Sequence, residues 1–326
     1  MPDTPMLFAL DAGRAYGEAV ARSLGLPLSA QEERVFEDGE HKVRSLESVR
    51  ERDVYVLHSL YAEPGQSVDD KLVRLLFFIG ALKDAAARRV TAVVPYLAYS
   101  RKDRKTKIRD PVTTRYVAQL FEAVGTRCVL TLDVHNLAAF QNAFRCRTEH
   151  LEATPLFTEE IAPRLGAAPV AVVSPDAGGI KRADAFRQRL EAALGRPVAS
   201  GFVEKYRSSG ALSGDRLAGD VSGRVAVIVD DLISTGSTVA RAAAVCRNAG
   251  ATRVVAVATH GVFTGEAEAT LTAAPIDEIL VSDSIPPLLI RSGALWTRLT
   301  VVSAVRLLGE AIRRLHAGES LLDISG

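Results

Sequence analysis

The sequence predicts an α/β protein of two similar domains, each built on a mainly parallel sheet flanked by helices. Three observations predict this fold class. Short β-branched runs alternate with longer helical patterns, the alternation occurs in both halves of the chain, and polar motifs follow the strand ends. The chain has 326 residues, 48% of them hydrophobic and 24% charged, which suits two packed domains and excludes a disordered chain.

Six apolar runs are predicted as buried strands, because each is short and rich in valine. They are Asp53–Leu57, Val90–Val94, Cys128–Leu132, Val170–Ser174, Val225–Val229 and Arg253–Ala258. Ligands of open parallel sheets bind beyond the carboxyl ends of the strands. The polar segments that follow these runs are therefore the candidate site.

Helical spacing is predicted in three of the intervals between strands. Val68–Ala87 has apolar residues at spacings of three and four positions. Pro111 suits the first turn of a helix that continues to Val124. Ser237–Ala249 ends directly before a glycine, which is common at a helix C-terminus.

The predicted domain boundary lies near residue 150, because Glu149–Thr154 is polar and lacks periodicity. It divides the chain into an N-terminal domain, 1–150, and a C-terminal domain, 151–326. The final predicted helix is Val302–His316, and the sequence leaves open which of the two domains it packs against.

Charge and cysteine content exclude several classes of protein. The net charge of +1, from 40 basic and 39 acidic residues, gives no field for nucleic acid or an anionic membrane. No apolar stretch approaches about 18 residues and no leader pattern opens the chain, so we expect a cytoplasmic protein without a membrane partner. Three cysteines, Cys128, Cys146 and Cys246, form no CxxC pair and are expected in the core of a protein from a reducing compartment.

The strongest functional signal is VDDLISTGST, residues Val229–Thr238. A buried strand leads into Asp230 and Asp231 and then into a loop that opens a helix. Unpaired N–H groups at a helix start bind phosphate, and Gly236 lets the backbone approach the ligand. The simpler alternative is a capped helix with two solvated aspartates. It is less favoured, because two adjacent acids seldom end a wholly apolar strand. The candidate loop residues are Ser234, Thr235, Gly236, Ser237 and Thr238.

The first half of the chain carries two further polar motifs. FEDGE, at Phe36–Glu40, combines an aromatic ring, acids and a glycine. PYLAYSRKDRK, at Pro95–Lys105, opens a dense basic loop, and residues 101–110 hold six basic and two acidic residues, a local charge of about +4. Triphosphate binding needs such a supply of cations. Taken alone, the basic run is better explained as a solvated face.

Two other motifs follow predicted strands. TLDVHN, at Thr131–Asn136, includes His135, and VVSPDAGGIKR, at Val172–Arg182, includes Asp176. Taken alone, His135 is more often a structural histidine than a ligand, and Asp176 could simply cap the following helix.

VDDLISTGST is not a Walker A loop, and it resembles the phosphoribosyl-diphosphate motif of the type I phosphoribosyltransferase fold. Together and in this order, the five motifs resemble the phosphoribosyl pyrophosphate synthetase family, also called the ribose-phosphate pyrophosphokinases, from about residue 5 to about residue 320. The resemblance implies that ATP donates its β,γ-diphosphate to the C1 hydroxyl of ribose 5-phosphate. The products are phosphoribosyl pyrophosphate and AMP, for nucleotide biosynthesis.

The resemblance also implies a role for each motif. ATP would be bound by residues of the first half: Phe36, Asp38, Glu40, Arg101, Lys102, Asp103 and His135. Ribose 5-phosphate would be bound by Asp176, by Asp230 and Asp231 at the sugar hydroxyls, and by Ser234–Thr238 at the phosphate. His135 and Asp176 would help to hold Mg²⁺. A K-x-R pair, Lys205 and Arg207, would be catalytic within a mobile glycine- and serine-rich loop, Phe202–Gly223. Taken alone, this segment is as well explained as a surface hairpin with ordinary charges.

Family members form hexamers or smaller assemblies, so the resemblance implies a homo-oligomer in which a neighbouring subunit supplies Glu40. Three departures from the family pattern are visible. Lys102 stands where several members have glutamine, and Ser234 stands where many bacterial members have aspartate. Ala81–Arg89 lacks the arginine and serine of the phosphate-activated, ADP-inhibited class, which predicts weak or absent regulation of that kind.

Two other functions compete with this interpretation. A plain phosphoribosyltransferase would explain VDDLISTGST but leave FEDGE, the basic loop and DVHN without a role. A non-catalytic regulatory homologue would not need Lys205 or Arg207. Formation of AMP from ATP and ribose 5-phosphate, without a nucleobase, distinguishes the synthetase from both.

Overall fold

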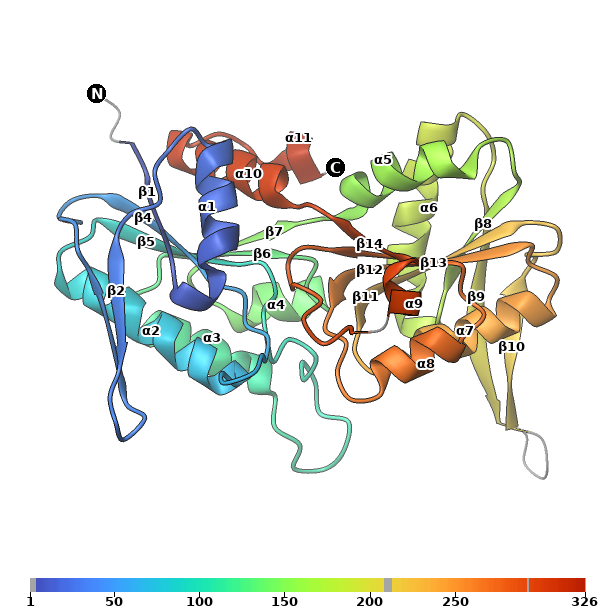
Figure 1. Ribbon diagram of the computed structural model, residues 1–326, viewed down its shortest axis with the longest axis horizontal. Helices are drawn as coiled ribbons and strands as arrows, with labels where there is room; N and C mark the ends of the chain where they lie inside the picture. Colours follow the sequence, from blue (N-terminus) through green and yellow to red (C-terminus); the bar gives the residue numbers. More distant parts are fainter. Residues whose placement is uncertain (1–3, 208–212, 292, 326) are drawn as a thin grey trace. The chain divides into compact units, whose positions relative to one another are not determined.

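The computed structural model describes residues 4–207, 213–291 and 293–325, and within them the chain forms two compact units. Unit 1 combines Met1–Glu152 with Ala304–Gly326, and unit 2 is Ala153–Ser303. Each unit is an α/β layer structure around a mainly parallel sheet (Figure 1). In the part of the chain that is described, no helix has both the length and the apolar character that a membrane crossing needs.

Unit 1 is built on a five-stranded parallel sheet of order β1-β4-β5-β6-β7, with a separate two-stranded hairpin, β2–β3. Its strands are β1 Met6–Ala9, β2 Gln31–Val35, β3 His41–Ser45, β4 Asp53–Leu57, β5 Arg89–Val94, β6 Cys128–Leu132 and β7 Arg147–Leu151. Its helices are α1 Arg14–Ser23, α2 Val68–Asp84, α3 Thr113–Ala123, α4 Leu137–Ala143, α10 Val305–Ala317 and α11 Leu322–Ser325. Apolar residues of α2 and α3 form one core with the sheet.

Unit 2 is built on a seven-stranded sheet of order β10-β9-β8-β11-β12-β13-β14, in which only the β9–β10 pair is antiparallel. Its strands are β8 Val170–Ser174, β9 Ala199–Arg207, β10 Ser213–Gly219, β11 Val225–Ile233, β12 Arg253–Gly261, β13 Glu278–Ser282 and β14 Leu299–Val302. Its helices are α5 Thr154–Leu165, α6 Ile180–Leu194, α7 Ser237–Asn248, α8 Ala267–Ala273 and α9 Gly293–Trp296, with a 3-10 turn, η2, at Ala177–Gly179.

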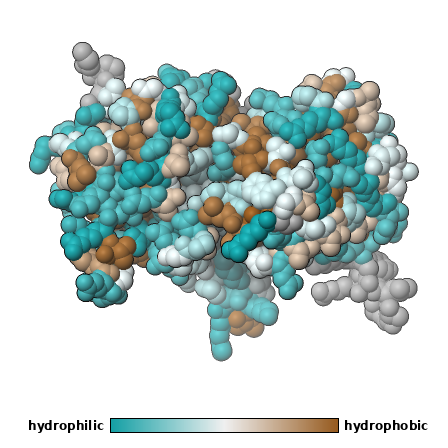
Figure 2. All heavy atoms as spheres, in the orientation of Figure 1, coloured by the Kyte–Doolittle hydropathy of each residue, from teal (hydrophilic) through white to brown (hydrophobic). Residues whose placement is uncertain are grey.

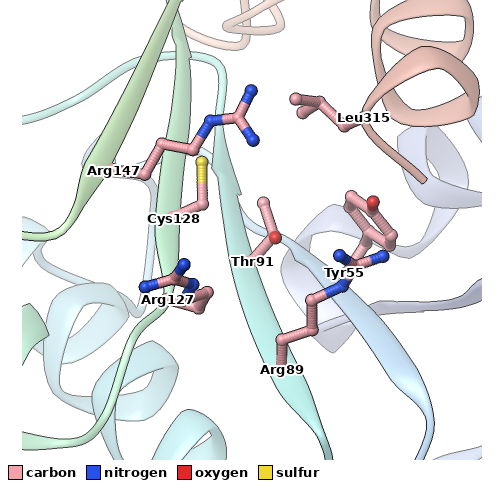
Figure 3. Close-up of a pocket in the computed structure, with 7 residues that line it drawn as sticks. All are labelled: Tyr55, Arg89, Thr91, Arg127, Cys128, Arg147 and Leu315. Carbon is pink, nitrogen blue, oxygen red and sulfur yellow. The ribbon is translucent and has the colours of Figure 1, made fainter. Parts of the chain in front are cut away.

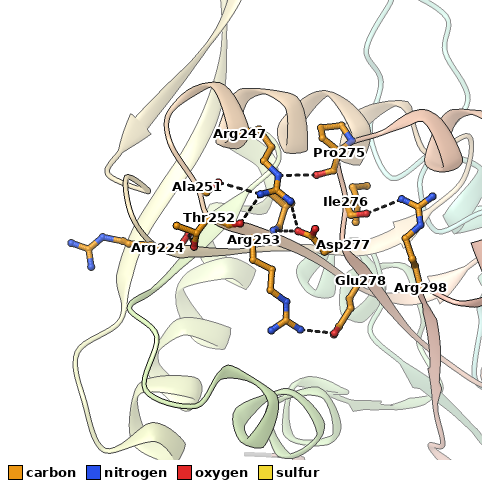
Figure 4. Close-up of polar contacts among 11 residues, drawn as sticks. Arg224, Arg247, Ala251, Thr252, Arg253, Pro275, Ile276, Asp277, Glu278 and Arg298 are labelled. Carbon is orange, nitrogen blue, oxygen red and sulfur yellow. Dashed lines mark hydrogen bonds and ion pairs between the residues drawn. The ribbon is translucent and has the colours of Figure 1, made fainter.

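Ion pairs brace the amino ends of β12 and β13 in unit 2 (Figure 4). Arg253 lies 2.5 Å from Glu278, and Arg247 pairs with Asp277. Asp277 also accepts the Val254 N–H at 2.6 Å, so it links the start of β12 to the segment before β13. This bracing lies at the edge of the sheet opposite the polar motifs, which follow the carboxyl ends.

The final helix of the fold, α10, packs against α1 and belongs to unit 1. The two helices approach closely at Gly309, where an added Cβ would lie 2.3 Å from Ser23 Oγ. At its last turn, His316 Nδ1 lies 2.7 Å from Asp53, a carboxylate that is fully buried at the start of β4. The predicted helix 302–316 therefore begins three residues later than expected, because Leu299–Val302 pairs with β13 as β14.

Four other sequence expectations need correction. The helix predicted to end at Ala87 ends at Asp84, because Ala86 adopts a positive φ of 66°. The helix expected to open at Pro111 begins at Thr113. The strand expected to end at Val229 continues to Ile233, because its pairing with β12 continues to Gly261. Most of the glycine-rich segment expected to be a loop forms the β9–β10 hairpin.

Candidate functional site

The phosphate loop of unit 2 connects β11 to α7. Gly236, at the N-cap of α7, has a φ of 79°, which the other amino acids rarely adopt. An added Cβ at Gly236 would lie 2.9 Å from Leu271 Cγ, so there is no space for a side chain. The positive φ and the close contact therefore both favour glycine here. Thr264 supports the loop from outside, since its N–H donates to the Ser234 carbonyl and its hydroxyl lies 2.9 Å from Ser234 Oγ. The loop therefore presents the start of α7 in a fixed conformation.

Asp230 and Asp231 lie inside β11, close to its carboxyl end. Asp231 is buried and Asp230 is partly buried. Arg182 of α6 lies 3.1 Å from Asp231 Oδ1 and 3.7 Å from Asp230 Oδ1. Burial, and then the negative charge of Asp231, raise the pKa of Asp230 to about 8. The pair is thus a set of acceptors whose charge depends on pH near neutrality.

Asp176 caps η2 and the start of α6 in the same unit. Its Oδ1 accepts the N–H groups of Gly178 and Gly179 at 2.8 and 3.1 Å. Its Oδ2 makes no hydrogen bond to a residue that the structure describes. The capping role considered for Asp176 is therefore present, and one carboxylate oxygen still faces outward for a ligand.

Arg241 of α7 ties the elements of this site together. Its Nη2 donates to the Pro175 carbonyl at 3.4 Å, and its Nε lies 3.4 Å from Asp215 Oδ2 of β10. Asp215 is paired in register with Lys205 of β9. One guanidinium therefore connects the phosphate helix with the segment before Asp176 and with the β9–β10 hairpin. The side chains of Lys205 and Arg207 lie outside the described part of the structure.

In unit 1, FEDGE forms the turn of the β2–β3 hairpin. The Phe36 N–H donates to the Glu40 carbonyl at 2.7 Å, and Asp38 accepts the Glu40 N–H at 3.0 Å. The guanidinium of Arg34 lies 5.0 Å from the centre of the Phe36 ring, which is 38% exposed. The turn therefore presents an aromatic face and acidic side chains to solvent.

The basic loop follows β5 and projects from unit 1 as a mainly hydrophilic protrusion (Figure 2). Asp110 holds it together, because it accepts from Lys102 Nζ at 2.6 Å and from the backbone of Thr106 and Lys107. The bond from Lys102, with those from the loop, holds the pKa of Asp110 well below its ordinary value. Lys102 is therefore engaged within the loop, whereas Arg101 is exposed.

The DVHN motif lies beside this loop, between β6 and α4. Asp103 accepts from Asn136 Nδ2 at 2.7 Å, which joins the basic loop to the end of β6. The Val134 N–H donates to His150 Nε2 at 3.2 Å, and His135 is exposed. Unit 1 thus brings Arg101, Asp103 and His135 onto two connected loops at the carboxyl edge of its sheet.

Comparisons with known proteins decide the family. Residues 5–125 match the model for the N-terminal domain of ribose phosphate pyrophosphokinase, and residues 213–324 match the phosphoribosyl synthetase-associated domain. The ribose-phosphate pyrophosphokinase of Aquifex aeolicus is 36% identical over 315 residues, 97% of each chain. That of Brucella melitensis is 37% identical over 316 residues, 97% of this chain and 98% of the relative. The chain belongs to the ribose-phosphate pyrophosphokinase family.

A solved structure agrees with this assignment. The phosphoribosylpyrophosphate synthetase of Mycobacterium smegmatis superposes with a TM-score of 0.85 at 34% identity, covering 97% of this chain and all of the other. The predicted family, the α/β fold class and the assignment to a transferase of phosphoribosyl pyrophosphate synthesis are therefore confirmed. The residue-by-residue roles remain predictions.

Sequence reasoning missed three side chains that this ribose-phosphate pyrophosphokinase family member uses to hold its candidate site. Arg182 faces the two acids of β11, Arg241 links three elements, and Thr264 supports the phosphate loop. Only Arg182 had a signal, since it ends the motif that begins at Val172, although no role was predicted for it. The other two act across distances in sequence that no local pattern reports.

The residues expected to hold a metal do not form a complete protein cage. Among residues 4–207, 213–291 and 293–325, no group of three histidine, cysteine, aspartate or glutamate side chains is placed to hold an ion. Magnesium commonly takes only one or two protein carboxylates and completes its shell with water and substrate phosphates. The single outward oxygen of Asp176 fits that pattern, whereas the nitrogen of His135 is less typical of a hard cation.

Proposed function

We propose that unit 1 binds ATP, that unit 2 binds ribose 5-phosphate, and that the β,γ-diphosphate passes to the C1 hydroxyl with release of AMP. The observation that carries the proposal is the β11–α7 connection. It places two carboxylates near the end of β11, and a short loop then leads to a glycine in the left-handed conformation at the start of α7. Unpaired N–H groups at that start, with the hydroxyls of Ser234, Thr235, Ser237 and Thr238, suit the 5-phosphate.

Asp230 and Asp231 would accept hydrogen bonds from the ribose 2- and 3-hydroxyls. An ionised carboxylate is an acceptor only, so it recognises hydroxyl donors and not another phosphate. Arg182 offsets part of the charge of this pair and keeps one face of it fixed. The sugar is thereby oriented by its hydroxyls at one end and by its phosphate at the other.

ATP would be held by the FEDGE turn and the basic loop. Phe36 offers an exposed ring for the base, and Asp38 and Glu40 offer acceptors. Arg101 and His135 lie on the two loops that Asp103 and Asn136 join, so they approach the phosphates as a set. Lys102 would contribute to the local field while it remains bonded to Asp110.

Transfer of the diphosphate depends mainly on positioning and on neutralising the charge that spreads over the phosphate oxygens. Lys205 and Arg207 of β9 are the proposed catalytic cations. Asp176 is the proposed protein ligand of magnesium, with His135 assisting. Bound magnesium would supply positive charge along the ATP phosphates. We assign no protein general base.

The proposed setting is a cytoplasmic homo-oligomer in which a neighbouring copy supplies Glu40 to the ATP site. Mixing inactive subunits tests this arrangement. A Glu40→Ala chain and a Lys205→Ala chain, each inactive alone, should regain part of the activity when they are combined, because some sites then contain both native residues. Activity that stays at the sum of the two single variants contradicts sharing.

The decisive experiment measures AMP formation from ATP and Mg²⁺ with and without ribose 5-phosphate. The wild type should form AMP only with the sugar phosphate. Lys205→Ala should lower kcat by about 100-fold or more, the usual loss when one transition-state contact is removed. The neighbouring exposed residue gives the matched control, Glu204→Gln, which should keep the wild-type rate. Absence of AMP from a folded wild type that binds ribose 5-phosphate would favour the regulatory homologue.

A further inference from the structure

Three buried polar side chains lie at the carboxyl ends of β12 and β13 in unit 2. They are His260, Ser282 and Ser284, which are 3%, 0% and 1% exposed, and we refer to them as the His260 network. His260 Nδ1 lies 2.8 Å from Ser284 Oγ, and Ser282 Oγ lies 2.8 Å from Ser284 Oγ. Ser282 Oγ also donates to the Thr259 carbonyl at 2.6 Å. None of the three belongs to the motifs assigned to ATP or ribose 5-phosphate.

The His260 network lies at an irregularity in the sheet. The pairing of β12 with β13 shifts register between Ala258 and His260, so Thr259 is the extra residue of a β-bulge. The Ser282 hydroxyl bonds to the carbonyl of that extra residue. Bulges redirect a strand and are common beside active sites, and a buried polar network whose members bond to one another is rigid. The network therefore sets the direction in which the chain leaves β12.

Directly after β12, residues 262–264 contact the phosphate loop of unit 2. The Phe263 N–H donates to the Ile233 carbonyl and the Thr264 N–H donates to the Ser234 carbonyl, both at 3.0 Å. Phe263 is buried and has a φ of 46°, a conformation that surrounding contacts must hold in place. The position of the loop therefore depends on residues 262–264, and their position depends on how β12 ends.

We infer that His260 and Ser284 are positioning residues for ribose 5-phosphate, which act through residues 262–264 on the phosphate loop. The inference rests on the proposed function, because it takes this loop as the site of the 5-phosphate of the sugar. The 5-phosphate is remote from the reacting C1 hydroxyl, so its contacts hold the substrate and the transition state equally. Loss of such uniform binding raises KM and leaves kcat unchanged. A merely structural role would instead lower the amount of folded enzyme, and with it the apparent kcat.

The test is steady-state kinetics of the full chain, with ribose 5-phosphate varied at saturating ATP. Ser284→Ala and His260→Leu should each raise the KM for ribose 5-phosphate by about tenfold, as expected for loss of a buried hydrogen bond. Neither should change kcat or the KM for ATP by more than about twofold. His260→Asn is the conservative variant. Its side-chain amide lies near the position of Nδ1, so it should keep most of the affinity that His260→Leu loses.

Two control variants should keep the wild-type KM for ribose 5-phosphate. Thr91→Val removes one buried hydroxyl, as Ser284→Ala does, but from the wall of a small cavity in unit 1 (Figure 3). Asp277→Asn removes the ion pair with Arg247 at the opposite, amino ends of β12 and β13 (Figure 4), so it weakens unit 2 without reaching the His260 network. Thermal unfolding of every variant measures the loss of stability separately.

A double-variant cycle tests the route from the network to the loop. Thr264→Val and Ser284→Ala act through the same segment, so the KM of the double variant should be no higher than that of the more affected single variant. An unchanged KM in Ser284→Ala, or a rise no larger than that in Asp277→Asn, overturns the inference. Ser237→Ala, in the loop itself, separates the inference from the proposed function. If Ser237→Ala raises KM and Ser284→Ala does not, the inference alone fails, and if neither raises KM, the assignment of the loop to the sugar phosphate fails as well.

Discussion

Asp230 and Asp231 are neighbours in sequence with different surroundings. Asp231 lies close to Arg182, whereas Asp230 is farther from that cation and carries the cost of burial beside a second acid. The proton that Asp230 keeps near neutrality has two consequences. First, the folded state loses stability as the pH rises from 3.8, the ordinary pKa of an aspartate, to about 8, the raised pKa of Asp230. In this range the unfolded chain has already released the proton that the folded chain still binds. Second, the proton removes one acceptor from the sugar site.

We therefore expect kcat/KM for ribose 5-phosphate to rise by about tenfold between pH 7 and pH 9, as Asp230 ionises. Asp230→Asn should lower the plateau and abolish this rise. A pH profile measured with saturating ATP checks both. A rise that persists in the variant would assign the titration to another group.

Gly236 combines a positive φ with a packed environment, and these two requirements can be separated by mutation. Gly236→Ala should cost about 1–2 kcal/mol for the left-handed conformation, with a further cost for the contact with Leu271. Adding Leu271→Ala should relieve the contact but not the backbone strain. Thermal unfolding and ribose 5-phosphate KM of the single and double variants test this. Full recovery in the double variant would mean that the clash alone matters.

At the scale of elements, local patterns predicted the strands that are buried on both faces. Four of the six apolar runs match their strands or extend by one residue, because continuous valine-rich segments need the centre of a sheet. β7 was missed, since RTEHL is polar and becomes a strand only through its pairing with β6. The β9–β10 hairpin was foreseen only as the simpler alternative to a mobile catalytic loop, because glycine and serine favour loops locally and the pairing depends on both segments together.

In the candidate site too, the features set by local sequence could be predicted and those set by distant partners could not. The sequence located residues at strand ends, because the rule for parallel sheets is local. It could not locate Arg241 or Thr264, whose partners are 66 and 30 residues away in the chain. It also could not foresee that Lys102 is bonded to Asp110 within its own loop.

Arg241 provides the prediction at this scale, because it joins α7, the segment before Asp176, and β10. Arg241→Gln should lower kcat by about tenfold with little change in either KM, since the substrates still meet their own ligands while the elements lose alignment. Arg216→Gln, at an exposed position beside Asp215, is the control. A rise in KM without a change in kcat would show that Arg241 acts on binding. Restoration by Arg241→Lys would support a simple charge contact.

At the scale of the molecule, the chain forms unit 1 from both of its ends. The segment Ala304–Gly326 returns to unit 1 after unit 2 is complete, and α10 buries Leu308, Ala311 and Ile312 there. His316 adds a contact to the buried Asp53. A simple division near residue 150 therefore describes only the first crossing between the units.

Truncation after Ser303 should destabilise unit 1 by several kcal/mol, at roughly 1.5–3 kcal/mol for each large apolar side chain that loses its burial. Limited proteolysis of the truncated chain should cut first within residues 4–152 and spare 153–303. Equal resistance of both units, or earlier cutting of unit 2, would contradict this. His316→Ala in the full chain should produce a smaller effect in the same direction.

The return of α10 also fixes an order of events during biosynthesis. Unit 2 is continuous in sequence, whereas unit 1 needs both ends of the chain. Unit 1 is synthesised first but cannot cover the face of its sheet beneath α10 until the C-terminal segment is available. We therefore expect the N-terminal unit, although it is made first, to complete its core only after translation has ended.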